Sequence, residues 1–332
     1  MSRRLRKLLT PPGVALAFAI TALLGAQQNQ NRGQGAGTAE IHVEPVRGHI
    51  YMLAGAGGNI TVSVGPDGAL IVDTGVAQMT DKVLATIQQI GSAHVPDFSS
   101  LPTPIRYIIN TTFDPEHIGG NVKIAESAFF DPVEGGEKII AHGNVLDRMN
   151  APVGGKTPEP FRGMVTDAYF TDYYKVNRFH NGECIEVIHI PDAHTDGDSI
   201  VWFRGSDVIS AGPILSTNTY PVIDPDKGGS VQGVIDGLNY LIDLSFPEFR
   251  GQGGTILVPA RGHLCYFNDV AYYRDVVTIV RDRVQDAIKK GMTLEQVKAA
   301  RLTRDYDGIY GATPGSPDKF VEAVYRSLTQ KK

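Results

Sequence analysis

Residues 110–121 read NTTFDPEHIGGN, a polar loop that begins with the last residue of the β-rich run IRYIIN at 105–110. The loop holds two carboxylates and one histidine, and it closes with a glycine pair of the kind found where a loop turns into a helix. A strand that ends in such a loop places polar side chains at the edge of a rigid sheet. We therefore expect a sheet protein whose chemistry lies at strand ends.

Three other apolar strands end in segments with similar side chains. Asp73 lies in IVDTG, His194 lies in HIPDAHTDGDS, and His263 ends LVPARGH. Loops at the ends of neighbouring strands can present their side chains to one point. We expect these residues to meet His117 of the first loop.

The remaining pattern predicts two similar β-then-α halves. Short apolar runs with turn residues fill 41–75, and a helical pattern over 77–91 precedes the strand at 105–110. Further β-type runs and helices follow in the same order, with strands at 137–142, 184–191, 199–205, 207–212 and 254–260 and helices near 143–149, 230–245, 269–289, 294–302 and 317–329. This order predicts an α+β fold, an αββα sandwich in which two mixed sheets pack face to face and helices cover the outer faces.

The N-terminal residues have the pattern of a secretory signal. Four basic residues, between positions 3 and 7, precede an apolar run over 14–24 that ends in Gly25 and Ala26. We expect residues 1–26 to be a cleaved signal peptide, with a retained N-terminal anchor as the alternative, and the protein to be periplasmic or secreted. The polar, glycine-rich residues 27–38 are expected to be a disordered tether, which leaves residues 39–332 as one domain.

The charge balance narrows the range of partners. The 332 residues carry 31 Lys and Arg against 36 Asp and Glu, and loss of residues 1–26 would leave 27 basic residues and a charge of −9. A chain this acidic is not expected to bind nucleic acid or an anionic membrane, so a small molecule is the expected partner.

The two cysteines, Cys184 and Cys265, are expected either to form a disulfide or to be buried structural thiols, and Cys265 could instead lie beside a metal.

These segments, in this order and spacing, resemble those of the metallo-β-lactamase fold superfamily. Its members are αββα sandwiches that mostly bind one or two metal ions and activate water. The resemblance runs from IVDTG through NTTFDPEHIGGN and PDAHTDGDSIVW to VPARGH, and several short motifs in order are far more specific than one alone. It implies a metal-dependent hydrolase that acts on a small molecule.

The resemblance also assigns ligand positions, most of which are changed here. The family loop usually reads Asn-Thr-His-x-His-x-Asp-His-x-Gly-Gly-Asn, so its four ligand positions fall on Thr112, Asp114, Glu116 and His117. Only His117 is unchanged. His194 and His263 match the two later histidines, while Pro213 stands where a bridging carboxylate is usual and offers no ligand atom.

The changed ligands favour a single metal ion over two. Thr112, Asp114 and His194 would form a weak or empty subsite, because a threonine hydroxyl is a poor zinc ligand. Glu116, His117 and His263 would form a complete first shell for a catalytic zinc, and iron or manganese remains open at such an oxygen-rich site. A rearranged single site would draw its ligands from Asp114, Glu116, His117, His194 and His263.

The remaining site residues are given supporting roles. Asp114 is the expected general base for a metal-bound water, since it lies two residues before Glu116 on the same loop. Asp73 and Thr112 are expected to support the ligands from behind, through hydrogen bonds.

Three functions remain open at this point. The first is a mononuclear hydrolase that cleaves an ester, lactone, lactam or related bond. The second is a non-catalytic binding protein that kept the fold, and the third is an iron-dependent oxidoreductase on the same fold.

Overall fold

The computed structural model describes residues 40–127, 138–151, 162–176, 179–246, 253–313 and 316–330. They belong to one compact unit, which runs from Glu40 to Lys332. The proposed signal peptide and tether lie outside the described residues.

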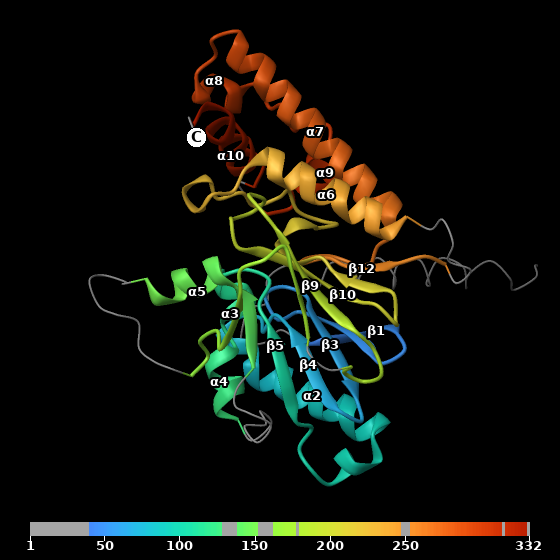
Figure 1. Ribbon diagram of the computed structural model, residues 1–332. Coiled ribbons are helices and arrows are strands. Elements are labelled where there is room, and N and C mark those ends of the chain that lie inside the picture. Colours follow the sequence, from blue (N-terminus) through green and yellow to red (C-terminus); the bar gives the residue numbers. More distant parts are fainter. Residues whose placement is uncertain are drawn as a thin grey trace, which may run out of the picture. The chain divides into compact units, whose positions relative to one another are not determined.

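The first sheet has seven strands in the order in which they occur along the chain (Figure 1). Strands β1 to β4 are antiparallel neighbours, and β5, β6 and β7 add to β4 in parallel. Their bounds are His42–Arg47 (β1), Ile50–Ala54 (β2), Ile60–Gly65 (β3), Gly68–Val72 (β4), Ile105–Ile109 (β5), Ile139–His142 (β6) and Asp167–Tyr169 (β7). A bulge between Pro45 and Arg47 interrupts the pairing of β1.

The second sheet has five strands in the order β12-β11-β10-β9-β8. The pair β11 and β12 is parallel, and the other pairs are antiparallel. The bounds are Tyr173–Lys175 (β8), Ile185–Ile190 (β9), Asp198–Phe203 (β10), Val208–Ser210 (β11) and Ile256–Val258 (β12). Both sheets are therefore mixed, as the sequence predicted.

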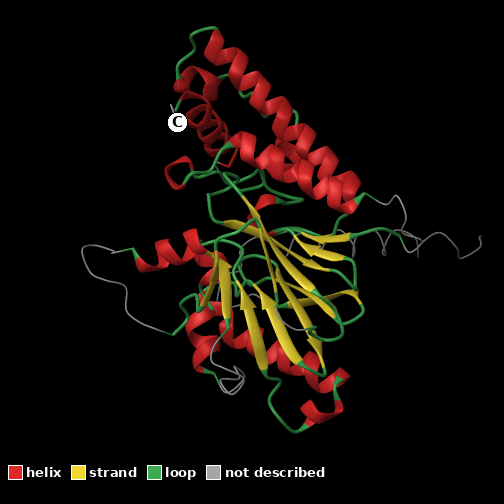
Figure 2. Ribbon diagram, viewed as in Figure 1, coloured by secondary structure: helices red, strands yellow, loops and turns green. Residues whose placement is uncertain are grey.

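The two sheets face each other across an apolar core. Leu70, Val72 and Ile109 of the first sheet pack in one cluster with Val201 and Phe203 of the second, and all five side chains are buried. Helices lie on the outer faces, as Figure 2 shows. The predicted αββα sandwich is thus confirmed.

Helices α2 to α5 belong to the first sheet, and α6, α7 and α10 lie beyond the second (Figure 1). A second apolar cluster joins Ile188 and Ile200 of the second sheet to residues of α6, α7 and α10. The helices span Thr80–His94 (α2), Pro115–Ile118 (α3), Asn121–Glu126 (α4), Gly143–Asn150 (α5), Val231–Ser245 (α6), Phe267–Lys289 (α7), Leu294–Ala299 (α8), Asp307–Tyr310 (α9) and Ser316–Thr329 (α10). Short 3₁₀ turns occupy Ala77–Met79, Pro96–Ser99, Gly212–Ile214 and Pro225–Lys227.

Helix α6 is placed by a close approach to the loop that carries His194. Ser230 caps the helix, because its Oγ accepts a hydrogen bond from the backbone N–H of Gly233 at 2.9 Å. A Cβ atom on Gly233 would lie only 1.9 Å from the carbonyl oxygen of Asp192. Only glycine therefore lets the start of α6 rest on the 192–194 loop.

This contact makes Gly233→Ala a test of the packing. The added methyl group forces the helix off the loop, so we expect the free energy of unfolding to fall by about 1–3 kcal/mol. Gly308→Ala in α9 is the matched control, since a Cβ there meets nothing within 4 Å, and it should leave stability unchanged or raise it by up to about 1 kcal/mol. Urea denaturation of both variants measures the difference, and equal stabilities would contradict the close approach.

Candidate functional site

The loops at the strand ends meet around a small cavity of about 30 Å³. Its lining includes Asp114, Glu116 and His117 after β5, His194 after β9, Pro213 after β11 and Arg261 after β12. The cavity has room for about one water molecule. The expected meeting of strand-end residues therefore occurs, around a cavity much smaller than a usual small-molecule site.

Asp73 holds the first loop in place from behind. Its backbone has φ of +64°, a left-handed conformation that is uncommon for residues other than glycine. One carboxylate oxygen accepts the backbone N–H of Thr111 at 2.8 Å, and the other accepts the Thr111 hydroxyl and lies 2.7 Å from Nδ1 of His117. Asp73 and His117 are both buried, and the charge of Asp73 raises the pKa of His117 although burial acts the other way. This contact fixes the orientation of the His117 ring through Nδ1, and Nε2 is the ring nitrogen that does not face Asp73.

The asparagines of the quoted loop have a structural role. The side-chain amides of Asn110 and Asn121 hydrogen-bond each other at 2.7 and 3.1 Å, and both are buried. Thr74 donates a further hydrogen bond to Asn121 at 2.9 Å. Helix α4 begins at Asn121, directly after the glycine pair, as the loop-to-helix prediction had it. These contacts fix the backbone conformation of the loop independently of which residues stand at its ligand positions.

His194 lies between two carboxylates. Its Nε2 is 3.1 Å from Asp114, and its Nδ1 is 3.5 Å from Asp198, which is fully buried, and 3.5 Å from the hydroxyl of Thr112. Burial lowers the pKa of His194, but hydrogen bonds to Asp114 and Asp198 outweigh burial and raise it to about 10. The hydrogen bond from His194 lowers the pKa of Asp114 to about 2. At neutral pH the pair is an imidazolium and a carboxylate.

Two further cations neutralise the carboxylates of the loop. The guanidinium of Arg261 forms an ion pair with Glu116, and Nζ of Lys227 lies 3.8 Å from Asp114 and 2.9 Å from Asp224. Sequence patterns did not point to Arg261 or Lys227. Arg261 is one of many basic residues in loops after strands, and Lys227 ends the 3₁₀ turn Pro225–Lys227, so neither position stands out in the sequence.

The side chain of His263 lies apart from the cavity. Its side chain is exposed, and its Nδ1 lies 2.9 Å from the hydroxyl of Thr217. The residue of this loop that lines the cavity is Arg261, two positions earlier. Between them Gly262 turns the chain with φ of +96°, which directs the two side chains differently.

The donor set does not fit the metal ion that the resemblance implies. A metal needs unprotonated imidazoles and free carboxylates. Here the carboxylate of Glu116 is paired with the guanidinium of Arg261, and the carboxylates of Asp114 and Asp198 on either side of His194 favour its protonated form. Pro213 contributes no donor atom. Over the described parts of the chain, no three His, Cys, Asp or Glu side chains converge in an arrangement that could hold a metal.

Both cysteines are free thiols, so of the arrangements left open by the sequence the disulfide is not the one observed. Cys265 is buried next to β12, where its backbone exchanges two hydrogen bonds with Leu257 at 2.8 and 3.1 Å. Burial raises the pKa of its thiol. This is the structural role that the sequence analysis gave as the alternative to pairing.

The hydrogen bonds of Asp73 predict a large loss of stability in Asp73→Ala. That change leaves buried donors on Thr111 and His117 without an acceptor, so we expect unfolding to become easier by about 3–5 kcal/mol. Asp73→Asn is the control, because asparagine tolerates the left-handed backbone and keeps one acceptor oxygen, and it should lose less. Equal losses in urea denaturation would show that the carboxylate itself contributes little.

The ion pair of Asp114 and His194 predicts a pH dependence. The raised pKa of His194 means that its stabilising effect is complete below its usual 6.5 and disappears as the pH rises through about 10. The lowered pKa of Asp114 means that its effect is complete above 3.8 and disappears as the pH falls through about 2. The stability difference between the natural protein and Asp114→Asn should therefore be largest between about pH 4 and 6.5 and shrink toward about pH 10. A difference that stays constant over this range in urea denaturation would argue against the ion pair, with Asp81→Asn at a surface pair as control.

Comparison with known proteins agrees with this architecture. Residues 54–269 match the family model of the metallo-beta-lactamase superfamily. No curated protein matches the chain in sequence. Among solved structures, the inverting sec-alkylsulfatase Pisa1 from Pseudomonas sp. superposes with a TM-score of 0.60 at 16% identity, over 88% of this chain and 50% of the sulfatase. This chain thus spans about half the length of that enzyme.

Two β-lactamases superpose over a shorter part of this chain. DIM-1 metallo-beta-lactamase has a TM-score of 0.52 at 14% identity, over 72% of this chain and 97% of its own. The metallo-beta-lactamase from Pontibacter korlensis has a TM-score of 0.51 at 13% identity, over 72% and 99%. At these identities the likeness concerns the fold. Together with the family match, it shows that this chain belongs to the metallo-beta-lactamase superfamily.

Proposed function

We propose that this protein is a metal-independent, non-hydrolytic member of the superfamily that binds a small molecule. The observation that supports the proposal most directly is the ion pair of Arg261 with Glu116. A guanidinium brings its fixed positive charge to a carboxylate that would otherwise be available to a metal. A metal ion at Glu116 would have to displace that cation.

The second half of the site supports the same proposal. His194 and Lys227 provide positive charge to Asp114, which was the expected general base. A carboxylate whose pKa lies near 2 is a weak base, because it holds a proton poorly at neutral pH. A cavity of about 30 Å³ is also far smaller than the usual site for an organic molecule.

The mononuclear hydrolase remains the second candidate, and one observation favours it. Nδ1 of His117 is bonded to the carboxylate of Asp73, as is common in histidines whose other ring nitrogen binds a metal. This candidate needs Arg261 to leave Glu116 and a further ligand to replace the misplaced His263. Zinc would be its metal, with iron or manganese as alternatives, and the oxidoreductase proposal needs the same rearrangement with iron.

The location proposed from the sequence is periplasmic or secreted. It depends on residues 1–26, which lie outside the described residues. None of the helices in the described part of the chain combines the length and the apolar character needed to span a bilayer.

Metal content distinguishes the two candidates. The protein, purified without chelators and without added metal, should contain no stoichiometric zinc, iron or manganese by elemental mass spectrometry. Added zinc should not raise its thermal midpoint, because only a ligand that binds the folded state stabilises it. Stoichiometric metal that is lost in His117→Ala would overturn the proposal in favour of the mononuclear hydrolase.

A gain-of-binding variant makes the test sharper. Arg261→His frees Glu116 and adds an imidazole to the cavity that His117 lines, so zinc should bind and raise the thermal midpoint. Arg261→Gln is the matched control, since it removes the guanidinium without adding an imidazole, and it should respond less. If the natural protein responds to zinc as strongly as Arg261→His, Arg261 does not exclude the metal.

A further inference from the structure

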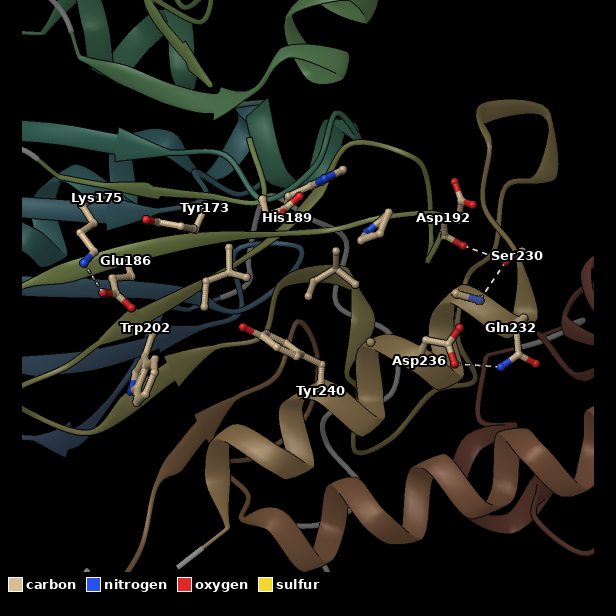
Figure 3. Close-up of a pocket in the computed structure, with 16 residues that line it drawn as sticks. Tyr173, Lys175, Glu186, His189, Asp192, Trp202, Ser230, Gln232, Asp236 and Tyr240 are labelled. Carbon is tan, nitrogen blue, oxygen red and sulfur yellow. Dashed lines mark hydrogen bonds and ion pairs between the residues drawn. The ribbon is translucent and has the colours of Figure 1, made fainter. Parts of the chain in front are cut away.

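A much larger pocket, of about 690 Å³, lies between the second sheet and α6 (Figure 3). Strands β8, β9 and β10 form one side of it and the first turns of α6 form the other. Ile188 and Ile190 contribute apolar side chains from β9. The volume is within the range of small-molecule sites, whereas that of the strand-end cavity is not.

Three aromatic rings line this pocket, namely Tyr173, Trp202 and Tyr240 (Figure 3). Tyr173 is 58% exposed and Tyr240 is 41% exposed, so both rings are accessible. Large aromatic side chains usually bury more of their surface, and rings left open inside a pocket are typical of a binding surface.

Two of these rings already have side-chain cations over them. Nζ of Lys175 is 5.7 Å from the ring centre of Tyr173, and the guanidinium of Arg204 is 4.2 Å from that of Trp202. The faces of aromatic rings carry partial negative charge and attract cations. These contacts within the protein indicate that the aromatic surface prefers positive charge.

Carboxylates add to that preference. The lining includes four of them, on Asp172, Glu186, Asp192 and Asp236, against the ammonium of Lys175, and Arg204 over Trp202 adds one more positive charge beside the lining. Lys175 and Arg204 both pair with Glu186, at 3.3 and 3.1 Å, so the acidic excess comes from the aspartates. Burial and then the charge of Glu186 raise the pKa of Tyr240.

We propose that this pocket binds an organic cation, a small molecule in which an amine or quaternary ammonium group is attached to a flat apolar body. The cationic group would lie among the aspartates and the face of Tyr240, and the apolar body would lie against Ile188 and Trp202. The inference rests on the proposed binding function and names the class of its ligand. Its test involves no metal, so either proposal can fail without the other.

The chain provides its own probe, because Trp202 is its one tryptophan. Titration with benzyltrimethylammonium should change the tryptophan emission in a saturable way. Benzyl alcohol and phenylacetate, which present the same ring with no charge and with a negative charge, should bind at least about tenfold more weakly.

Variants connect the signal to the pocket. Tyr240→Ala should weaken binding of benzyltrimethylammonium about tenfold, while Tyr240→Phe keeps the ring face and most of the affinity. Asp236→Asn should weaken binding about threefold, because one attracting charge is lost. Tyr272→Ala on α7 and Asp243→Asn on α6 are exposed controls outside the pocket lining, and both should bind as the natural protein does.

Three results would overturn the proposal. One is the absence of saturable binding at millimolar probe. Another is binding of benzyl alcohol or phenylacetate as tight as that of the cation, which would mean an apolar or anion site. The third is unchanged affinity in both Tyr240→Ala and Asp236→Asn when their thermal midpoints show that they are folded.

Discussion

The buried carboxylate of Asp73 is the constraint on which the site depends. It lies directly after β4 and binds the backbone and hydroxyl of Thr111, which follows β5, so it ties together the ends of two parallel strands. The same group fixes the ring of His117. Because a buried charge is costly without such partners, the loop has one favoured position, and the residues that follow it are set at fixed places around the cavity.

In the proposed metal-independent site, the positive charge at the cavity comes from side chains of the chain itself. A metal ion is exchangeable and brings its charge from solution, whereas Arg261 and Lys227 are held by the chain itself. An arginine fork also prefers the planar geometry of a carboxylate, so Glu116, longer by one methylene than the usual aspartate, is suited to it. The substitutions along the loop are therefore mutually consistent, since the carboxylates and the cations that neutralise them occur together.

The sequence predicted the sandwich because its signals are local and ordered: each strand has its own apolar run, and the motifs follow one another as in the family. It also predicted that the strand-end loops meet. It missed Arg261 because a two-residue difference within a loop depends on the turn at Gly262, which spacing alone does not reveal. The pocket beside α6 was equally hidden, because it is formed by side chains from strands and a helix far apart in the chain. The stretch at 167–175, whose aromatic residues fit either an exposed strand edge or an entrance wall for substrate, supplies both β7 and β8.

The outer strands of the two sheets have a consequence for how this protein behaves at high concentration. A long, flat outer strand offers unpaired backbone groups on which another chain can add. Here β7, β8 and β12 are each three residues long, and β12 is further covered by its bridge to Cys265. The longer β1 carries Pro45, which lacks an N–H group, beside its bulge. Each sheet thus ends in strands that resist β-addition, which favours a protein that stays dispersed and does not form intermolecular sheets.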